Sequence, residues 1–319
     1  MHVWRSCFIT PWLILFAGTA FGQFGRGEQP ADENPAGQQL EQQLVQRYQV
    51  GVIIRAGAMP CAGLTGSAPV PMNWPEQQVR IVDEEISPDV RRVSYRQQDG
   101  LRQMVFSIPQ LPPGNTAEVM VTFEVTRRSV APPSNPAAFV FPKRVPADLR
   151  VYLASSPGID CRQSSIRNKA KELVEGQEHV WKQVETIYDW VRDNVAYRNG
   201  TFKGATATLK DGSGNKEDLV SLFVALCRAN EIPARTVWVV DHVHAEFYLM
   251  ASNGRGYWLP CQVAGTREFG GISDHRPILQ KGDNFKVPGK PPQRFVPEDL
   301  TGKGGSPHVE FVRKMLAAN

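Results

Sequence analysis

Residues 212–235, GSGNKEDLVSLFVALCRANEIPAR, join a glycine-rich turn to an amphipathic helix. Asn215 is a favourable N-cap, and the acid Asp218 follows three residues later, where it suits the positive end of a helix. After the turn, apolar side chains recur every three or four residues, which is the period of a helix that buries one face. The segment therefore predicts a helix that begins at Lys216 and has a buried stripe of Leu219, Leu222, Phe223, Leu226 and Cys227.

The sequence around this helix indicates an α+β domain. A second apolar stripe at helical spacing predicts a helix over roughly residues 178–197, and ELVEGQEHVW (172–181) indicates a shorter helix and a turn before it. Three β-rich segments follow the helix that begins at Lys216, and SNGRG (252–256) is typical of a hairpin turn between the last two. Helices followed by antiparallel strands are the order of an α+β fold. The β-rich segments are ARTVWVVD (234–241), HAEFYLMA (244–251) and GYWLPCQVA (256–264).

Five short β-rich runs, separated by proline, glycine and asparagine, lie between residues 48 and 130. Such runs at near-regular spacing are typical of a small antiparallel β-sandwich, which we expect over residues 45–131. The proline-rich segment 132–145 is then a linker. Residues 146–319 form the α+β domain with a proline- and glycine-rich C-terminal extension, in which PHVEFVRKML (307–316) predicts a short helix. The runs are YQVGVIIRA, QQVRIVDEEI, RRVSYRQ, RQMVFSIPQL and AEVMVTFEVTRRSV.

The amino-terminal segment has the pattern of a secretory signal peptide. Residues 1–22 combine a basic start, an apolar stretch and small residues ahead of an expected cut before Gln23. Residues 23–44, rich in Gln, Gly, Glu and Pro, are then a flexible leader. We expect the protein to be exported, to the periplasm or as a secreted protein. Because no second apolar run reaches spanning length, we expect no stable membrane insertion.

The net charge and the cysteine content limit the kinds of partner and metal site that we expect. The formal net charge of +4 is mild, and no dense Lys/Arg stripe interleaves with aromatic residues, so we expect no nucleic-acid partner. Export permits disulfides, but the four cysteines after the signal allow three pairings, and their pairing stays open. The absence of a CxxC motif argues against structural zinc. These four cysteines are Cys61, Cys161, Cys227 and Cys261.

Three separated motifs carry a resemblance to a known family. They are LFVALCRANEIPARTVWV (222–239), HVHAEFYL (242–249) and GYWLPCQ (256–262). In this order and at this spacing they resemble the transglutaminase-like superfamily, which shares its core with papain-like cysteine peptidases. The resemblance covers roughly residues 170–265. It implies helices packed on an antiparallel sheet, with a catalytic triad in which Cys opens the helix, His begins a strand and Asp closes the next strand.

The resemblance implies a site in which two of the three triad positions are changed. Lys216 holds the position of the nucleophilic Cys, His242 that of the base, and Gln262 that of the orienting Asp. In the family, the helix end favours a thiolate, and the His takes the thiol proton. A protonated lysine cannot attack an amide. Gln262 can still donate and accept hydrogen bonds, so it could orient His242 without a charge.

Other residues are poor substitutes for the missing thiol. Cys227 lies on the buried stripe, and Cys261 should point to the opposite sheet face from Gln262. Ser213 precedes the helix, but no residue nearby would activate it. Lys216 could act as an amine with a lowered pKa, but we favour a side chain that reaches water, because perturbed lysines normally need burial.

The pattern His242, His244, Glu246 raises the alternative of a metal site, because these side chains share one face of a strand. We do not favour it, since the resemblance already explains His242 and no fourth ligand is evident. We therefore expect no metal and no cofactor. We interpret Arg228 and Arg235 as surface or capping residues.

These observations lead us to expect an exported transglutaminase-like pseudoenzyme that binds protein or peptide in the remnant acyl-transfer cleft. One alternative is an active acyltransferase or peptidase with a non-Cys nucleophile. Another is a structural or adaptor module that binds through exposed aromatic residues of its β domain. The sequence carries no signal for an oligomeric state.

Overall fold

The computed structural model describes residues 39–141 and 145–317. The predicted signal peptide (1–22) and most of the predicted leader lie outside these residues. The leader, expected to reach residue 44, ends earlier, because strand β1 runs from Gln39 to Arg55. Residues at the start of β1 pair with the end of β6, so they belong to the sandwich.

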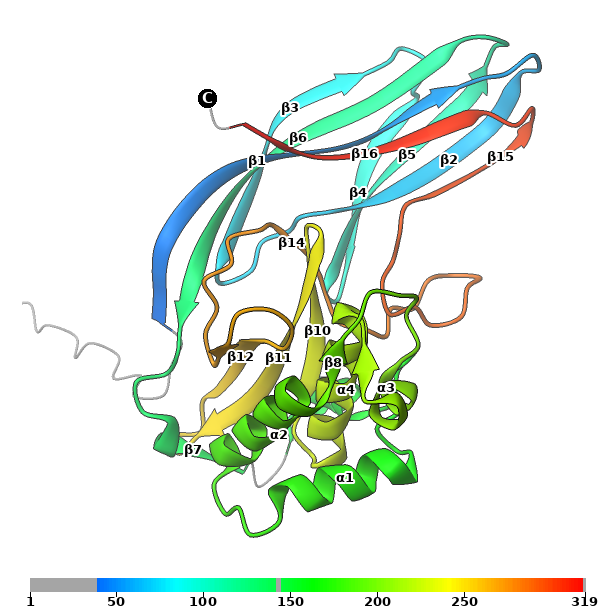
Figure 1. The fold of residues 1–319 in the computed structure, drawn as a ribbon. Helices are drawn as coiled ribbons and strands as arrows, with labels where there is room; N and C mark the ends of the chain where they lie inside the picture. Colours follow the sequence, from blue (N-terminus) through cyan, green and yellow to red (C-terminus); the bar gives the residue numbers. More distant parts are fainter. Residues whose placement is uncertain (1–38, 142–144, 318–319) are drawn as a thin grey trace, which may run out of the picture. The chain divides into compact units, whose positions relative to one another are not determined.

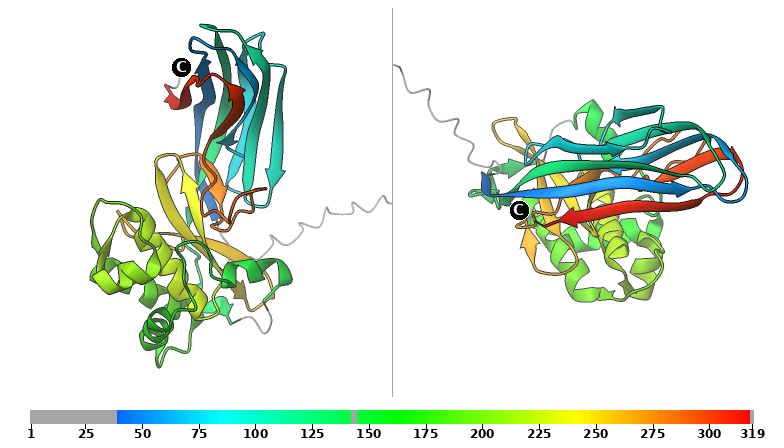
Figure 2. Two further views of the ribbon diagram at one scale, coloured as in Figure 1. Left: turned by 90° about the vertical axis from the view of Figure 1, so that its right-hand side faces the viewer. Right: turned by 90° about the horizontal axis from the view of Figure 1, so that it is seen from above.

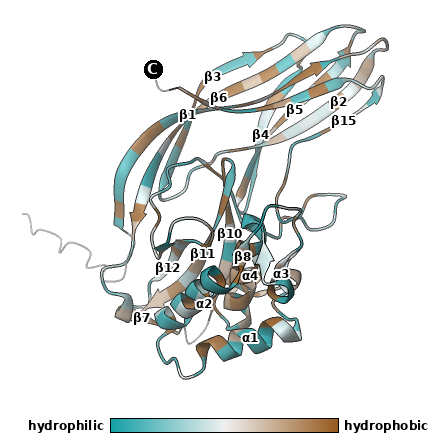
Figure 3. Cartoon of the chain, in the orientation of Figure 1, coloured by the Kyte–Doolittle hydropathy of each residue, from teal (hydrophilic) through white to brown (hydrophobic). Residues whose placement is uncertain are grey.

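A four-stranded antiparallel sheet forms one layer of the sandwich (Figure 1). Its strand order is β16-β1-β6-β3, with β3 at Gln77–Ile86, β6 at Thr116–Ala131 and β16 at His308–Leu316. Apolar and polar positions alternate along these long strands (Figure 3). The inward-facing residues of β1, such as Val50, Val52 and Ile54, are buried. This alternation is what the sequence pattern of a half-buried strand predicts.

The second layer is continuous with the sheet of the α+β domain. Ten strands join in the order β13-β12-β11-β10-β14-β5-β2-β15, with β4 paired to β5 and β7 paired to β11. The join is narrow, since β14 meets β5 at Gln280 and Leu101. The bounds are β2 Cys61–Val70, β4 Arg92–Gln98, β5 Leu101–Leu111, β7 Phe139–Val140, β10 Ala234–Val239, β11 His242–Ala251, β12 Gly256–Gln262, β13 Glu268–Phe269, β14 Ile278–Lys281 and β15 Asp299–Gly304.

The predicted α+β fold with an antiparallel sandwich is confirmed. The five predicted runs correspond to β1 and β3–β6, whereas β2, which lies between the first two of these runs, was not predicted. Its sequence, CAGLTGSAPV, is rich in small residues and lacks the β-branched pattern that identifies strands. β2 nevertheless contributes Leu64, Ala68 and Val70 to the sandwich core, because its neighbours β5 and β15 fix its pairing.

The short C-terminal helix predicted over residues 307–316 is wrong. This segment is strand β16, which pairs with β1 from Arg47 to Arg55. Its apolar spacing fits either structure, and the open edge of β1 decides the outcome, because unpaired strand edges accept a further strand. Strand β15 likewise pairs with β2. The α+β domain is therefore inserted between β6 and β15, and residues 299–316 return to the sandwich.

The helices of the α+β domain gather beside strands β10–β12 and apart from the four-stranded sheet (Figures 1 and 2). Helix α4 (Lys216–Ala229) packs against β10 and β11, and α1 and α2 pack against α4. Every α4 residue from Asp218 to Arg228 is buried, including the predicted stripe. The remaining elements are α1 Ser164–Val174, α2 Val180–Asn194, α3 Ala205–Asp211, the 3₁₀ turns η1 Pro136–Ala138 and η2 Ala147–Leu153, and the parallel pair β8 Ala196–Tyr197 and β9 Ser213–Gly214. None of the helices in the described ranges is long and apolar enough to cross a membrane.

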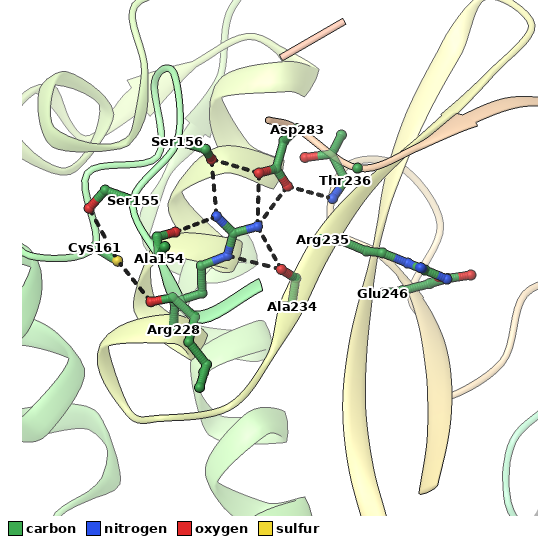
Figure 4. Close-up of polar contacts among 12 residues, drawn as sticks. Ala154, Ser155, Ser156, Cys161, Arg228, Ala234, Arg235, Thr236, Glu246 and Asp283 are labelled. Carbon is green, nitrogen blue, oxygen red and sulfur yellow. Dashed lines mark hydrogen bonds and ion pairs between the residues drawn. The ribbon is translucent and has the colours of Figure 1, made fainter. Parts of the chain in front are cut away.

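Arg228 fixes the C-terminal end of α4 (Figure 4). Its guanidinium donates to the carbonyls of Ala234 and Ala154 and to the Ser156 hydroxyl. It also forms a buried ion pair with Asp283 at 2.7 Å. Of the two predicted roles of Arg228, surface or capping residue, the surface position is wrong, because Arg228 is 4% exposed. Removing one partner of such a pair typically costs about 3–5 kcal/mol, because the other charge stays buried.

Candidate functional site

The start of α4 is held by a buried carboxylate. Asn215 accepts a hydrogen bond from the Asp218 amide at 2.9 Å, and Asp218 accepts one from the Asn215 amide at 3.0 Å, which confirms the predicted N-cap. The second Asp218 oxygen accepts from the amides of Lys203 and Gly204 at 2.8 and 2.9 Å. The loop before α3 is thus tied to the first turn of α4, and Lys216 is the first residue of that turn.

His242 and Gln262 meet at adjacent strand ends. His242 opens β11, and its Nε2 lies 2.9 Å from Oε1 of Gln262, the last residue of β12. The Gln262 backbone carbonyl accepts hydrogen bonds from the Tyr188 hydroxyl and from Arg192 on α2, at 2.8 and 3.0 Å. An amide oxygen only accepts, so this contact assigns the proton to Nε2. The imidazole is oriented by a neutral partner.

The environment of His242 keeps its imidazole neutral. Burial lowers its pKa below 6.5, and the charges of Arg276 and Lys216 lower it further, while the hydrogen bond with Gln262 opposes them. Its Nδ1 is buried and has no hydrogen-bond partner among the described residues. The imidazole therefore presents an unsatisfied acceptor.

Lys216 and His242 line the same cleft, which we call the His242 cleft. It has a volume of about 380 Å³, and its walls include Lys216, Glu217, Trp238, His242, Arg294 and Phe295. Gln262 lies behind the imidazole that it orients. The structure thus brings the three predicted site residues together. The catalytic positions assigned to Lys216, His242 and Gln262 stay predictions.

The cysteines of the described ranges lie away from this cleft. All four are buried and free, and none of them lines the cleft. Burial raises the pKa of Cys227 and of Cys261 well above the ordinary range, so both favour the neutral thiol. Both belong to the hydrophobic core beneath the sheet. The open question of disulfide pairing is answered by free thiols in this structure.

Glu246 is engaged by cations on the sheet rather than by a metal. Arg235 bonds it at 2.7 Å, and Lys281 bridges it at 2.5 Å to a second buried acid, Glu76, also at 2.5 Å. Burial alone would raise the pKa of Glu246, but Lys281 and Arg235 lower it to about 2. Over the described residues, no group of three His, Cys, Asp or Glu side chains is arranged to hold a metal ion.

Most of this buried ion network was not predicted from the sequence. Arg235, expected at the surface, is 8% exposed, and its guanidinium stacks 4.0 Å above the Trp258 ring. Figure 4 shows it directed toward Glu246, on the neighbouring strand. Glu76 and Lys281 are separated by 205 residues, so no local pattern could pair them. Only the folding of the sandwich against the α+β sheet brings their charges together.

The proline- and lysine-rich segment KGDNFKVPGKPPQRF (281–295), to which the sequence assigns no chemistry, contributes to the His242 cleft. Arg294 bonds Glu217 on the first turn of α4 and stacks 5.3 Å from the Trp238 ring. Phe295 lies 5.1 Å from the same ring. We call residues 281–295 the strap. An Arg-Phe pair in a proline-rich segment does not by itself indicate a functional site. Its role depends on where the segment lies in the folded protein.

Residues 167–263 match the sequence profile of the transglutaminase-like superfamily. No curated protein matches the chain. A solved structure from Cytophaga hutchinsonii, described as a "putative cysteine protease", has 16% sequence identity and a TM-score of 0.59, covering 89% of this chain and 94% of that chain. A "putative protease" from Parabacteroides distasonis has 14% identity and a TM-score of 0.28, covering 69% of this chain and 47% of that one.

The matched segment spans α1 to the end of β12 and contains all three motifs of the sequence analysis. The TM-score of 0.59 over 89% of the chain shows that the first of these structures shares the fold of both the sandwich and the α+β domain. Residues 167–263 of this chain are thus similar to the transglutaminase-like superfamily, which confirms the resemblance that the sequence motifs indicated.

His244 should make the fold sensitive to acid. It is 1% exposed, and burial is the main cause that lowers its pKa from 6.5 to about 3. Between those values the unfolded chain takes up a proton that the folded chain does not, so the free energy of unfolding falls as pH falls, by at most about 1.4 kcal/mol per pH unit. We expect His244→Gln to reduce this slope between pH ~6.5 and ~4.5, above the range in which Glu246 contributes.

Urea unfolding across this pH range measures that slope. His308→Gln, which changes an exposed histidine on β16, is the matched control and should retain the wild-type slope. An unchanged slope in a folded His244→Gln variant would contradict the assignment of this acid sensitivity to His244.

Proposed function

We propose that this protein is a catalytically inactive transglutaminase-like protein that binds protein or peptide in the His242 cleft. The observation that carries the proposal is the side chain at the first position of α4. Acyl transfer in this fold needs a thiolate there, and this chain has Lys216. An ammonium group has no lone pair with which to attack a carbonyl carbon.

The surroundings of Lys216 support the same conclusion. His242 is neutral and could accept a proton, but no thiol of the described residues lines the cleft to give one. The buried cysteines favour their neutral thiols, which are poor nucleophiles. The base is therefore oriented, but no thiol of the described residues lies in the cleft for it to activate.

The shape of the cleft supports ligand binding. Its volume of about 380 Å³ falls in the range of natural ligand pockets, which combine apolar walls with a few convergent polar groups. Trp238 and Phe295 supply the apolar wall, and Lys216 and His242 supply polar groups. The adaptor alternative calls for exposed aromatic residues on the β domain. The large hydrophobic side chains exposed on β1 and β3 are instead aliphatic: Leu44, Val45, Ile81 and Ile86.

Wild-type protein should catalyse neither incorporation of a fluorescent primary amine into a glutamine-containing protein nor hydrolysis of peptides. The reason is the missing nucleophile, so the signal should equal that of a His242→Ala variant. Turnover that disappears in His242→Ala would overturn the proposal and favour an active enzyme with a non-Cys nucleophile.

The variant Lys216→Cys should acquire a reactive thiol. A helix N-terminus favours the thiolate, and His242 lies in the same cleft to accept the proton. We expect alkylation by iodoacetamide at neutral pH to be faster than in the unfolded chain, measured by mass spectrometry. Ser213→Cys, three residues before α4, is the matched control and should react at an ordinary rate. If Lys216→Cys reacts no faster than the unfolded chain, the cleft does not retain the frame of a thiol site.

We further propose that the protein is exported, on the basis of the basic and apolar pattern of residues 1–22. Expression of the full chain in a bacterium, followed by fractionation and N-terminal sequencing, tests this. The exported chain should begin at Gln23, and Ile14→Asp should block processing by interrupting the apolar stretch. A wild-type chain that stays in the cytoplasm with residues 1–22 attached would contradict export.

A further inference from the structure

The positive charge of Lys216 is left without a partner inside the His242 cleft. Its side chain is exposed and forms no ion pair or hydrogen bond with any residue of the described ranges. The two acids that follow it on α4 are already engaged. Glu217 is bonded by Arg294, and Asp218 accepts hydrogen bonds from backbone amides. The ammonium group of Lys216 therefore makes no direct contact with either acid of its own helix turn.

A structural role would not favour a cation at this position. The first turn of a helix carries partial positive charge, so a lysine there is less favourable than an acid. The neighbouring residues Glu217 and Asp218 follow the ordinary preference for acids, and Lys216 departs from it. An anion bound in the cleft would remove this conflict, because it would pair with the ammonium and with the helix end together.

His242 supplies the second polar feature of the cleft. Its Nε2 proton is used by Gln262, and its Nδ1 is a buried acceptor with no partner among the described residues. Such an acceptor calls for an N–H or O–H donor, because a buried polar atom without a partner costs free energy. An anion alone would not satisfy it. A ligand that carries such a donor close to its negative charge would satisfy Lys216 and His242 together.

The apolar wall adds a third requirement. Trp238 and Phe295 pack 5.1 Å apart beside the polar groups, and the Arg294 guanidinium stacks 5.3 Å from Trp238. Aromatic surface in such a cleft favours an apolar side chain on the ligand. A polypeptide carboxylate combines the three properties: a negative charge, a nearby amide N–H and a neighbouring apolar side chain.

We propose that the His242 cleft binds a carboxylate of a polypeptide, which pairs with Lys216 while an adjacent ligand amide donates to His242 Nδ1. This inference rests on the proposed function of the cleft in peptide binding. The carboxylate has two possible sources, the C-terminus of a chain and an acidic side chain. Both present the same group to Lys216.

Fluorescence anisotropy with labelled peptides tests the inference on the full chain. One pair shares a phenylalanine-containing sequence without acidic residues and differs in a free or amidated C-terminus. A second, amidated pair differs in Glu or Gln beside the phenylalanine. We expect the carboxylate member of at least one pair to bind about tenfold or more tightly than its neutral partner, as expected for a hydrogen bond to a charged group. The pair that responds identifies the source.

Variants then assign the preference to Lys216. Lys216→Met should abolish the difference within the responding pair, and Lys216→Arg should retain it. Lys286→Met, which removes an exposed lysine of the strap outside this cleft, should have no effect. Equal binding of carboxylate and neutral peptides by wild type, or a preference that survives Lys216→Met, would overturn the inference and leave peptide binding intact. Binding of none of the four peptides would overturn the inference together with the proposed function.

Discussion

The burial of helix α4 is the constraint on which the rest of the α+β domain depends. Every residue from Asp218 to Arg228 is inaccessible, so the polar groups at both ends need partners within the protein. Asp218 satisfies amides of the preceding loop at the first turn, and Arg228 bonds Asp283 and three other oxygen atoms at the last turn. These two contacts set the position of α4, and with it the point from which Lys216 enters the cleft.

The site therefore retains a rigid frame around an altered centre. Gln262 is held by α2 through its backbone carbonyl and orients His242, so the imidazole has a defined direction without a charged partner. Burial and the nearby cations keep this imidazole neutral. Replacing a thiolate by an ammonium reverses the sign of the charge at the helix end. This reversal is the reason why we propose that the cleft binds an anionic ligand group and does not catalyse attack on a carbonyl carbon.

The sandwich shares a sheet and a buried ion pair with the α+β domain. Its second layer is continuous with the α+β sheet through β14, and the buried acid Glu76 of the sandwich segment pairs with Lys281 beside Glu246. Cations and carboxylates alternate there, so each charge offsets the free-energy cost of burying its neighbour. The strap after β14 continues to Arg294 and Phe295 in the His242 cleft. The cleft is thus completed by residues far from the three motifs in sequence.

The sequence by itself determined the features that depend on local patterns. Apolar spacing and the Asn215 cap predicted α4 and its first residue, alternation predicted β1 and β3–β6, and three motifs identified the superfamily and the neighbouring positions of Lys216, His242 and Gln262. Only the tertiary structure decided the rest. The open edge of β1 made residues 308–316 a strand, and pairing with β5 made β2 a core strand. The packing of the sandwich against the α+β sheet brought Glu76 to Lys281. Such contacts depend on partners tens to hundreds of residues away, and no local pattern encodes them.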